Sequence, residues 1–112
     1  MEGKNPKTGL LPGTLDMLVL KALAGGPRHG HAIARLIQRC SEDVLRVEEG
    51  SLYPALQRLE MNGWIEGDWG VSENRRRARF YRLTPEGGDQ LHNETERYRL
   101  VTGAIARVMG AA

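Results

Sequence analysis

The chain has 112 residues, enough for one small domain, and its 40% hydrophobic and 27% charged residues are typical of a globular protein and exclude a disordered chain. This length leaves little room for a deep active-site cleft, so we expect neither an enzyme nor a cofactor. A single cysteine, Cys40, excludes an internal disulfide and favours a reducing cytoplasm, and we expect no membrane span and no signal peptide.

The net charge of 16 − 14 = +2 is unevenly distributed along the chain. Residues 74–82 contain five arginines and no acid, so the rest of the chain carries 11 − 14 = −3. An arginine run is often only a solvated surface. Strand-like sequence on both sides and the lack of compensating acids favour a localised polyanionic partner, in particular nucleic acid.

Three helices are predicted in the first half of the chain, after a polar segment, residues 1–9, that we expect to be a mobile tail. Apolar residues recur at helical spacing over residues 12–24 and 30–40, and Gly25-Gly26-Pro27 ends the first helix. A third helix is predicted over residues 51–61. Ser51 is its expected N-cap, Pro54 falls in its first turn, and Asn62-Gly63 ends it.

A hairpin and a long helix are predicted in the second half. Residues 64–69 alternate as a strand does, and residues 78–83 are the expected partner strand. The intervening residues 70–77 are too charged for a core and predict an exposed loop. Trp64 is the expected core tryptophan and Trp69 the exposed one. The run Thr84-Pro85-Glu86 predicts the start of a helix that reaches about residue 109.

This order of elements is that of a winged helix-turn-helix, an α+β and mostly α fold with residues 10–84 as the DNA-binding domain and 85–112 as a dimerisation helix. We expect the third helix to enter the major groove and the basic loop to lie along the backbone or in the minor groove. The polar face of the third helix offers Ser51, Tyr53, Gln57 and Arg58. The loop adds Arg75, Arg76, Arg77 and Arg79 as phosphate contacts.

Several segments resemble the PadR family of bacterial transcription regulators. The most specific is residues 49–60, Glu-Gly-Ser-Leu-Tyr-Pro-Ala-Leu-Gln-Arg-Leu-Glu. Weaker matches are residues 11–16 (Leu-Pro-Gly-Thr-Leu-Asp), 28–33 (Arg-His-Gly-His-Ala-Ile), 63–65 (Gly-Trp-Ile) and 79–87 (Arg-Phe-Tyr-Arg-Leu-Thr-Pro-Glu-Gly). Together the segments span roughly residues 10–90.

The resemblance implies a homodimeric winged-helix repressor in the bacterial cytoplasm, associated with the nucleoid. It implies that Ser51, Tyr53 and Arg58 stand where family members meet DNA, and that the last helix crosses to the partner subunit. His31 departs from the family pattern, in which an aromatic residue such as tyrosine is expected. With room for a single C-terminal helix, the chain resembles the short subgroup. Members respond variously to phenolic acids, drugs or other small molecules.

The last helix indicates a dimer on its own pattern. Leu91, Tyr98 and Ile105 are seven residues apart, and Val101 and Val108 follow Tyr98 and Ile105 by three residues, as in a coiled coil. We expect this stripe and the first helix, through Leu15 and Leu18, to form a two-fold interface. Two-fold symmetry places the recognition helices about 34 Å apart and predicts a palindromic operator.

A few residues could serve a ligand site, a metal site or a reactive thiol, and each of them also has a simpler structural role. A small apolar or phenolic ligand between subunits would contact Met17 and Tyr98. His29 and His31 have no third metal ligand nearby in the sequence, so we expect no metal and a packing and capping role. Cys40 is expected to pack as a small hydrophobe.

Two other functions remain open. One is a winged-helix protein-interaction module without sequence-specific DNA binding, in which the basic loop grips an acidic surface. RNA binding is less favoured, because the few aromatic residues form no stacking platform. Catalysis is disfavoured because no nucleophile, P-loop or dinucleotide motif occurs.

Overall fold

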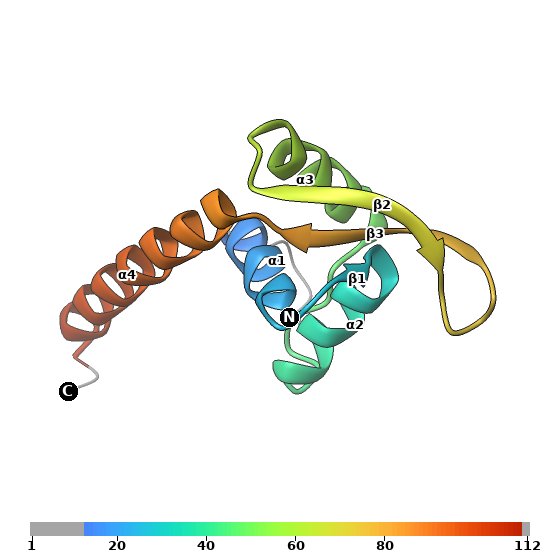
Figure 1. Ribbon diagram of the computed structural model, residues 1–112. Helices are drawn as coiled ribbons and strands as arrows, with labels where there is room; N and C mark the ends of the chain where they lie inside the picture. Colours follow the sequence, from blue (N-terminus) through green and yellow to red (C-terminus); the bar gives the residue numbers. More distant parts are fainter. Residues whose placement is uncertain (1–12, 111–112) are drawn as a thin grey trace.

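The structure, a computed structural model, describes residues 13–110 (Figure 1). Within them, four helices and the two strands of the hairpin follow the expected order. One additional short strand completes a three-stranded antiparallel sheet. The elements are α1 (Thr14–Ala24), β1 (Arg28–His29), α2 (Gly30–Cys40), α3 (Glu49–Met61), β2 (Ile65–Val71), β3 (Arg77–Leu83) and α4 (Pro85–Val108). The mostly helical α+β fold class is confirmed. The expected tail, residues 1–9, lies outside the described residues.

The core lies where α1, α2 and α3 meet one face of the sheet. Leu52, Leu56 and Leu59 line the buried side of α3, as their spacing predicts. The largest fully buried side chains are Val19, Leu20, Ile33, Leu52, Leu56, Leu59 and Ile65. Burying each contributes about 1.5–3 kcal/mol, so this cluster fixes α3 and the sheet relative to each other. Trp64 packs partly buried against it, whereas Trp69 is exposed, as predicted.

Cys40 is exposed, and the prediction that it packs as a small hydrophobe is wrong. It follows the buried Ile37 by three residues, so it continues the apolar stripe of α2 in projection. Cys40 is also the last residue of α2, where the stripe has already left the core. The periodicity predicts which side of the helix Cys40 faces. It does not predict whether a neighbouring element extends far enough to cover it.

α3 begins two residues earlier than predicted, so Ser51 is not its N-cap. The backbone carbonyl of Glu48 accepts hydrogen bonds from the N–H groups of Ser51 (3.0 Å) and Leu52 (2.9 Å). Pro54 consequently lies in the second turn rather than the first. Its missing N–H leaves the carbonyl of Gly50 without a helical donor. Gly50 is exposed, so water can supply the missing donor.

β2 and β3 form the wing, with the wing loop, residues 72–76, between them. The strands pair from Ile65 opposite Leu83 to Val71 opposite Arg77, which makes the loop shorter than the predicted 70–77. A Cβ atom on Gly70 would lie 2.9 Å from the Phe80 ring, so the glycine allows the ladder to continue there. β1 pairs with the other side of β3. Two residues carry no periodicity, which is why β1 was missed.

The start of α4 is confirmed in detail. The Thr84 hydroxyl accepts the N–H of Gly87 (3.0 Å) and donates to the carbonyl of Gly63 (2.7 Å), and Pro85 is the first helical residue. The N-terminal part of α4 packs beside α1, and the rest projects away from the body (Figure 1). No helix among residues 13–110 has both the length and the apolar character needed to cross a membrane.

Candidate nucleic-acid interface

The predicted recognition residues lie on the exposed side of α3. They are Ser51, Tyr53, Gln57 and Arg58. Tyr53 lies so close to α2 that a Cβ on Gly30 would be 2.9 Å from its hydroxyl oxygen, so Gly30 is required for this approach. The Arg58 guanidinium donates a hydrogen bond to Asp16 of α1 at 2.8 Å. Arg58 is therefore held in one direction, and a phosphate would compete with a carboxylate for it.

The wing loop and the first residue of β3 carry the exposed charge. Arg75, Arg76 and Arg77 are exposed, and within residues 13–110 none of them forms an ion pair. Arg75 has a φ of 61°, the left-handed conformation at the turn, where its N–H donates to the carbonyl of Ser72. The guanidinium of Arg77 lies 4.5 Å from the ring centroid of Trp69, a cation–π contact that orients both side chains.

Arg79 differs from the three loop arginines because it is only partly exposed and pairs with Glu60 of α3. The hydrogen bond that Arg79 donates to the Glu60 carboxylate holds the pKa of Arg79 above its usual value. A Cβ on the neighbouring Gly67 would lie 2.5 Å from the Arg79 Nε, so this glycine leaves the passage that Arg79 needs. The geometry gives Arg79 the role of joining the wing to α3, beside the phosphate contact expected from the sequence.

Replacing Glu60 with glutamine tests how Arg79 is used. Without the carboxylate, Arg79 becomes available to phosphate, so we expect tighter binding to any duplex and a salt slope steeper by about 0.9. The control is Glu66→Gln, whose carboxylate pairs with Arg82 on the opposite face of the wing and should leave the slope unchanged. Equal slopes for Glu60→Gln and the unchanged chain would show that Arg79 does not reach DNA.

The wing loop is joined to the start of α2. His29 caps α2 by accepting the N–H of Ala32 at Nδ1 (3.3 Å), which confirms its capping role, and its Nε2 lies 3.7 Å from the Glu73 carboxylate. The Phe80 ring meets His29 edge-on, with ring centroids 5.3 Å apart. A backbone hydrogen bond, with a smaller contribution from His29, lowers the pKa of Glu73. These contacts set the position of the loop relative to α2.

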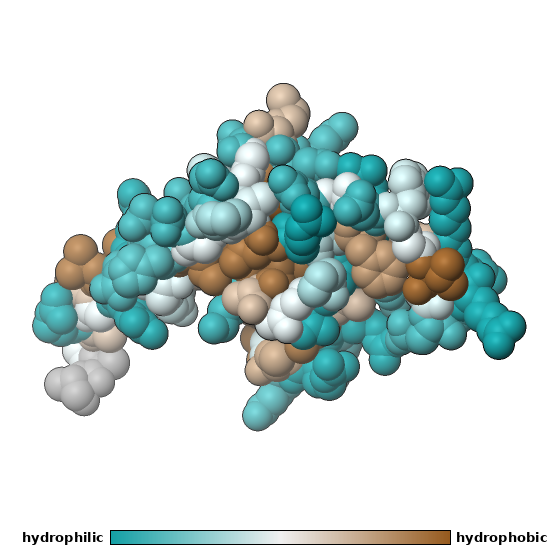
Figure 2. Space-filling model, viewed as in Figure 1, coloured by the Kyte–Doolittle hydropathy of each residue, from teal (hydrophilic) through white to brown (hydrophobic). Residues whose placement is uncertain are grey.

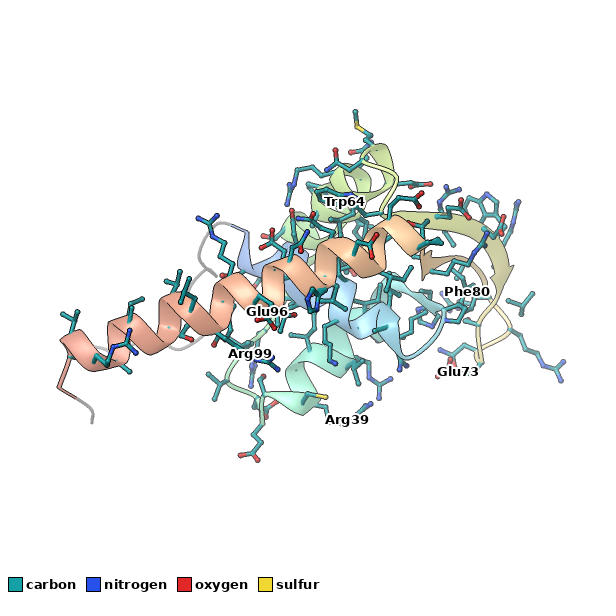
Figure 3. The ribbon with its side chains drawn as sticks, turned by 60° about the vertical axis from the view of Figure 1, so that its left-hand side comes forward. Arg39, Trp64, Glu73, Phe80, Glu96 and Arg99 are labelled. Atoms are coloured by element: carbon teal, nitrogen blue, oxygen red, sulfur yellow. The ribbon has the colours of Figure 1, made fainter. Side chains whose placement is uncertain are left out.

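α2, the N-terminal part of α3 and the wing enclose an open groove of about 810 Å³, which we call the arginine groove. Six arginines and one carboxylate line it, for a local balance of 6 − 1 = +5. The arginines are Arg28, Arg35, Arg39, Arg76, Arg77 and Arg79, and the carboxylate is Glu73. Figure 3 shows Arg39 on α2 and Glu73 on the wing loop, the two elements that border the groove.

Sequence reasoning found only half of these arginines. Arg28, Arg35 and Arg39 stand outside the arginine run, and the pairing of β1 with β3 brings them beside the wing. One signal was available: α2 contains Arg35 and Arg39 four residues apart and no acid. Among residues 13–110, no group of three or more His, Cys, Asp or Glu side chains is placed to hold a metal ion.

Comparisons with known proteins identify this arrangement. The model of the transcriptional regulator PadR-like family matches residues 19–93. The chain is 37% identical over 92 residues to the transcriptional regulator Rv3488 of Mycobacterium tuberculosis, covering 82% of this chain and 79% of that protein. It is 39% identical over 90 residues to an uncharacterized 37.1 kDa protein of a Streptomyces fradiae transposon. There the match covers 80% of this chain but only 24% of the longer protein.

A solved structure shares the fold. The structure of a transcriptional regulator from Clostridium thermocellum superposes with a TM-score of 0.75 and 32% sequence identity, over 82% of this chain and 89% of that one. The matching family and the mycobacterial relative are transcriptional regulators and not enzymes. The family model covers most of the elements that build the interface, including α2, α3 and the wing. This chain belongs to the PadR-like family of transcriptional regulators.

Proposed function

We propose that this regulator is a repressor that binds a palindromic DNA operator as a homodimer. The observation that carries the proposal is a group of exposed arginines on the wing, residues 75–77, beside the polar side of α3; within residues 13–110 none of them forms an ion pair. In this proposal α3 enters the major groove, where Gln57 and Arg58 meet base edges or phosphates. The wing loop supplies charge to the backbone or the adjacent minor groove. Occupying a promoter then excludes polymerase.

The C-terminal half of α4 supports the dimer. Leu91, on the first half of α4, packs against its own core, as do Leu15 and Leu18 of α1. The same stripe continues into the projecting half without cover: the exposed fractions are 51% for Tyr98, 44% for Val101, 54% for Ile105 and 85% for Val108. Figure 2 shows apolar side chains on this part of α4. A second copy of the helix, packed antiparallel or in a shallow crossing, would cover them.

Replacing Ile105 with aspartate is expected to separate the dimer, because a carboxylate buried between two apolar helices lacks a partner. The matched control is Ala106→Asp, which adds the same charge at an exposed position outside the stripe. Analytical ultracentrifugation should give monomers for the first variant and dimers for the second. Operator affinity should fall with the dimer. A dimer that survives Ile105→Asp would place the interface elsewhere.

Release by a small molecule is the other part of the proposal. α1 and α4 lie against each other, with Met17 partly buried and Tyr98 half exposed, so a flat apolar or phenolic molecule would bind where this seam meets the partner subunit. Such a ligand acts only by favouring a dimer that does not fit DNA. The test is the melting temperature of the protein in the presence of a set of phenolic acids and cationic dyes. If none of these compounds changes the melting temperature, the proposal of release by a small molecule is wrong.

Selection of duplexes from a random pool tests the core of the proposal. The expected winners contain an inverted repeat with half-sites one helical turn apart, about 34 Å between centres. A single preferred sequence without two-fold symmetry would contradict the dimer. Winners with no shared sequence would contradict sequence-specific regulation and favour a protein-interaction module.

A further inference from the structure

α2 carries two arginines that neither the fold nor the predicted interface uses. Arg35 and Arg39 are exposed, one turn apart on the helix, and both line the arginine groove. Within residues 13–110 neither forms an ion pair. The nearby carboxylate of Asp43 is engaged by other groups: it accepts a hydrogen bond from Gln38 at 2.7 Å and lies 3.9 Å from Arg46. Glu73 is the one carboxylate that lines the groove, and the charge of Arg35 contributes to its lowered pKa, so the charges on this wall are only partly compensated.

The opposite wall is also cationic. Arg76 and Arg77 of the wing line it, and Trp69 holds the guanidinium of Arg77 through the cation–π contact. The two other arginines of the groove are already bonded. Arg28 donates from Nε to the carbonyl of Ala22 at 2.9 Å, and Arg79 pairs with Glu60. Among residues 13–110, two arginines without an ion pair thus line the groove from α2 and two from the wing.

Two walls of like charge repel each other unless an anion lies between them, and the groove is partly open to solvent rather than enclosed. Small-molecule pockets are lined mostly by apolar side chains, whereas six of the 17 residues that line this groove are arginines. The groove lies between α2 and the wing, which is assigned to the minor groove, and Tyr53 of α3, the helix assigned to the major groove, also lines it. One strand of a DNA backbone separates those two grooves. A repeating phosphodiester chain is therefore the anion whose shape and position fit.

We propose that the arginine groove seats one DNA strand by its phosphates, with Arg35 and Arg39 of α2 contacting them from one side and Arg76 and Arg77 from the other. The inference rests on the proposed function and extends it, since it adds α2 to a DNA interface otherwise made of α3 and the wing loop. Contacts to phosphates carry no sequence information. Arg35 and Arg39 thus set affinity and register, and α3 sets sequence preference.

The test is the double variant Arg35→Ala, Arg39→Ala in the full chain. Losing two phosphate contacts should make the slope of log K against log salt shallower by about 1.8. It should also weaken binding to every duplex by about 30-fold at 0.15 M salt. The order of preference among duplexes should not change. Alanine favours helix, so α2 remains folded, which circular dichroism verifies.

The matched control is Arg99→Ala, Arg107→Ala, which removes the same charge from the side of α4 opposite its apolar stripe. It should leave the salt slope unchanged. The inference fails if the α2 variant keeps the slope of the unchanged chain, or if the control lowers the slope equally, since that would be a general charge effect. If the unchanged chain binds no duplex at all, the proposed function itself is wrong, which is a distinguishable result.

Competition with inorganic pyrophosphate distinguishes a site for the DNA backbone from a site for a small free anion. We expect millimolar pyrophosphate to compete with DNA only as strongly as its ionic strength predicts. Stabilisation of the unchanged chain by micromolar pyrophosphate, lost in the α2 variant while the DNA salt slope stays the same, would overturn the inference in favour of a site for a free anion.

Discussion

Changing Arg75, Arg76 and Arg77 together to alanine should weaken binding to all duplexes by about 170-fold at 0.15 M salt and flatten the salt slope by about 2.7, from three contacts at 0.9 each. The three side chains are exposed, and within residues 13–110 they make no ion pair, so their removal costs the fold little. Arg75 is in the left-handed conformation, which alanine tolerates about as well as arginine does. The loss should therefore appear in DNA binding and not in thermal stability.

The effect must be separated from that of net charge. A second triple variant, with Arg46, Arg99 and Arg107 changed to alanine, removes three positive charges from positions outside the wing and outside the arginine groove. Fluorescence anisotropy at four or more salt concentrations should give the slope of the unchanged chain for this control. The assignment of the wing loop to DNA is refuted by equal slopes for the two triple variants.

The largest effect on stability is expected from Gly87→Ala. A Cβ atom at this position would lie 1.9 Å from the backbone oxygen of Trp64 and 3.0 Å from Leu83 Cδ1. The backbone oxygen cannot move aside cheaply, because it also accepts the N–H of Thr84 at 3.1 Å. The first turn of α4 must then shift away from Trp64, in the segment between α3 and β2. We expect a loss of about 3 kcal/mol, near the upper range for overpacking, and a drop in Tm of about 12 °C or more.

The adjacent glycine is the control. A Cβ on Gly88 meets nothing within 4 Å, and alanine is favoured over glycine inside a helix by about 1 kcal/mol. Gly88→Ala should therefore raise the melting temperature measured by calorimetry, whereas Gly87→Ala lowers it. Effects of the same sign at both positions would show that the close packing of α4 on Trp64 does not limit stability.

The regular elements were predictable because each carries a local signal. α2 was predicted over its observed residues from an apolar spacing that includes Ile33 and Ile37. α4 was predicted from the Thr84-Pro85-Glu86 start. The loop boundaries were less accurate. Gly70 is a weak strand former in isolation, but its pairing with Ala78 and the space it leaves for Phe80 extend the ladder. Pairing of this kind depends on the partner strand and is not visible along one segment.

In the candidate site, too, some residues were predictable from local sequence and others were not. The arginine run is contiguous in sequence, so the wing loop was found. Arg79 and Glu60 are 19 residues apart, and only the packing of the wing on α3 makes them a pair. Arg35 and Arg39 stand singly in α2, and they join the interface because β1 brings the start of α2 to the edge of β3. Charge density along the chain indicates a polyanionic partner, but the surface that meets it is set by the fold.

The measurement that tests the account most directly is a titration of the full chain into fluorescent duplex DNA from upstream of its own gene, beside a scrambled duplex, at several salt concentrations. We predict a log–log salt slope of several units on both duplexes and a preference for the upstream sequence of at least 10³-fold, about the lower limit for specific binding. Equal binding to the two duplexes at every salt concentration, or no binding at low salt, would contradict a sequence-specific DNA-binding repressor.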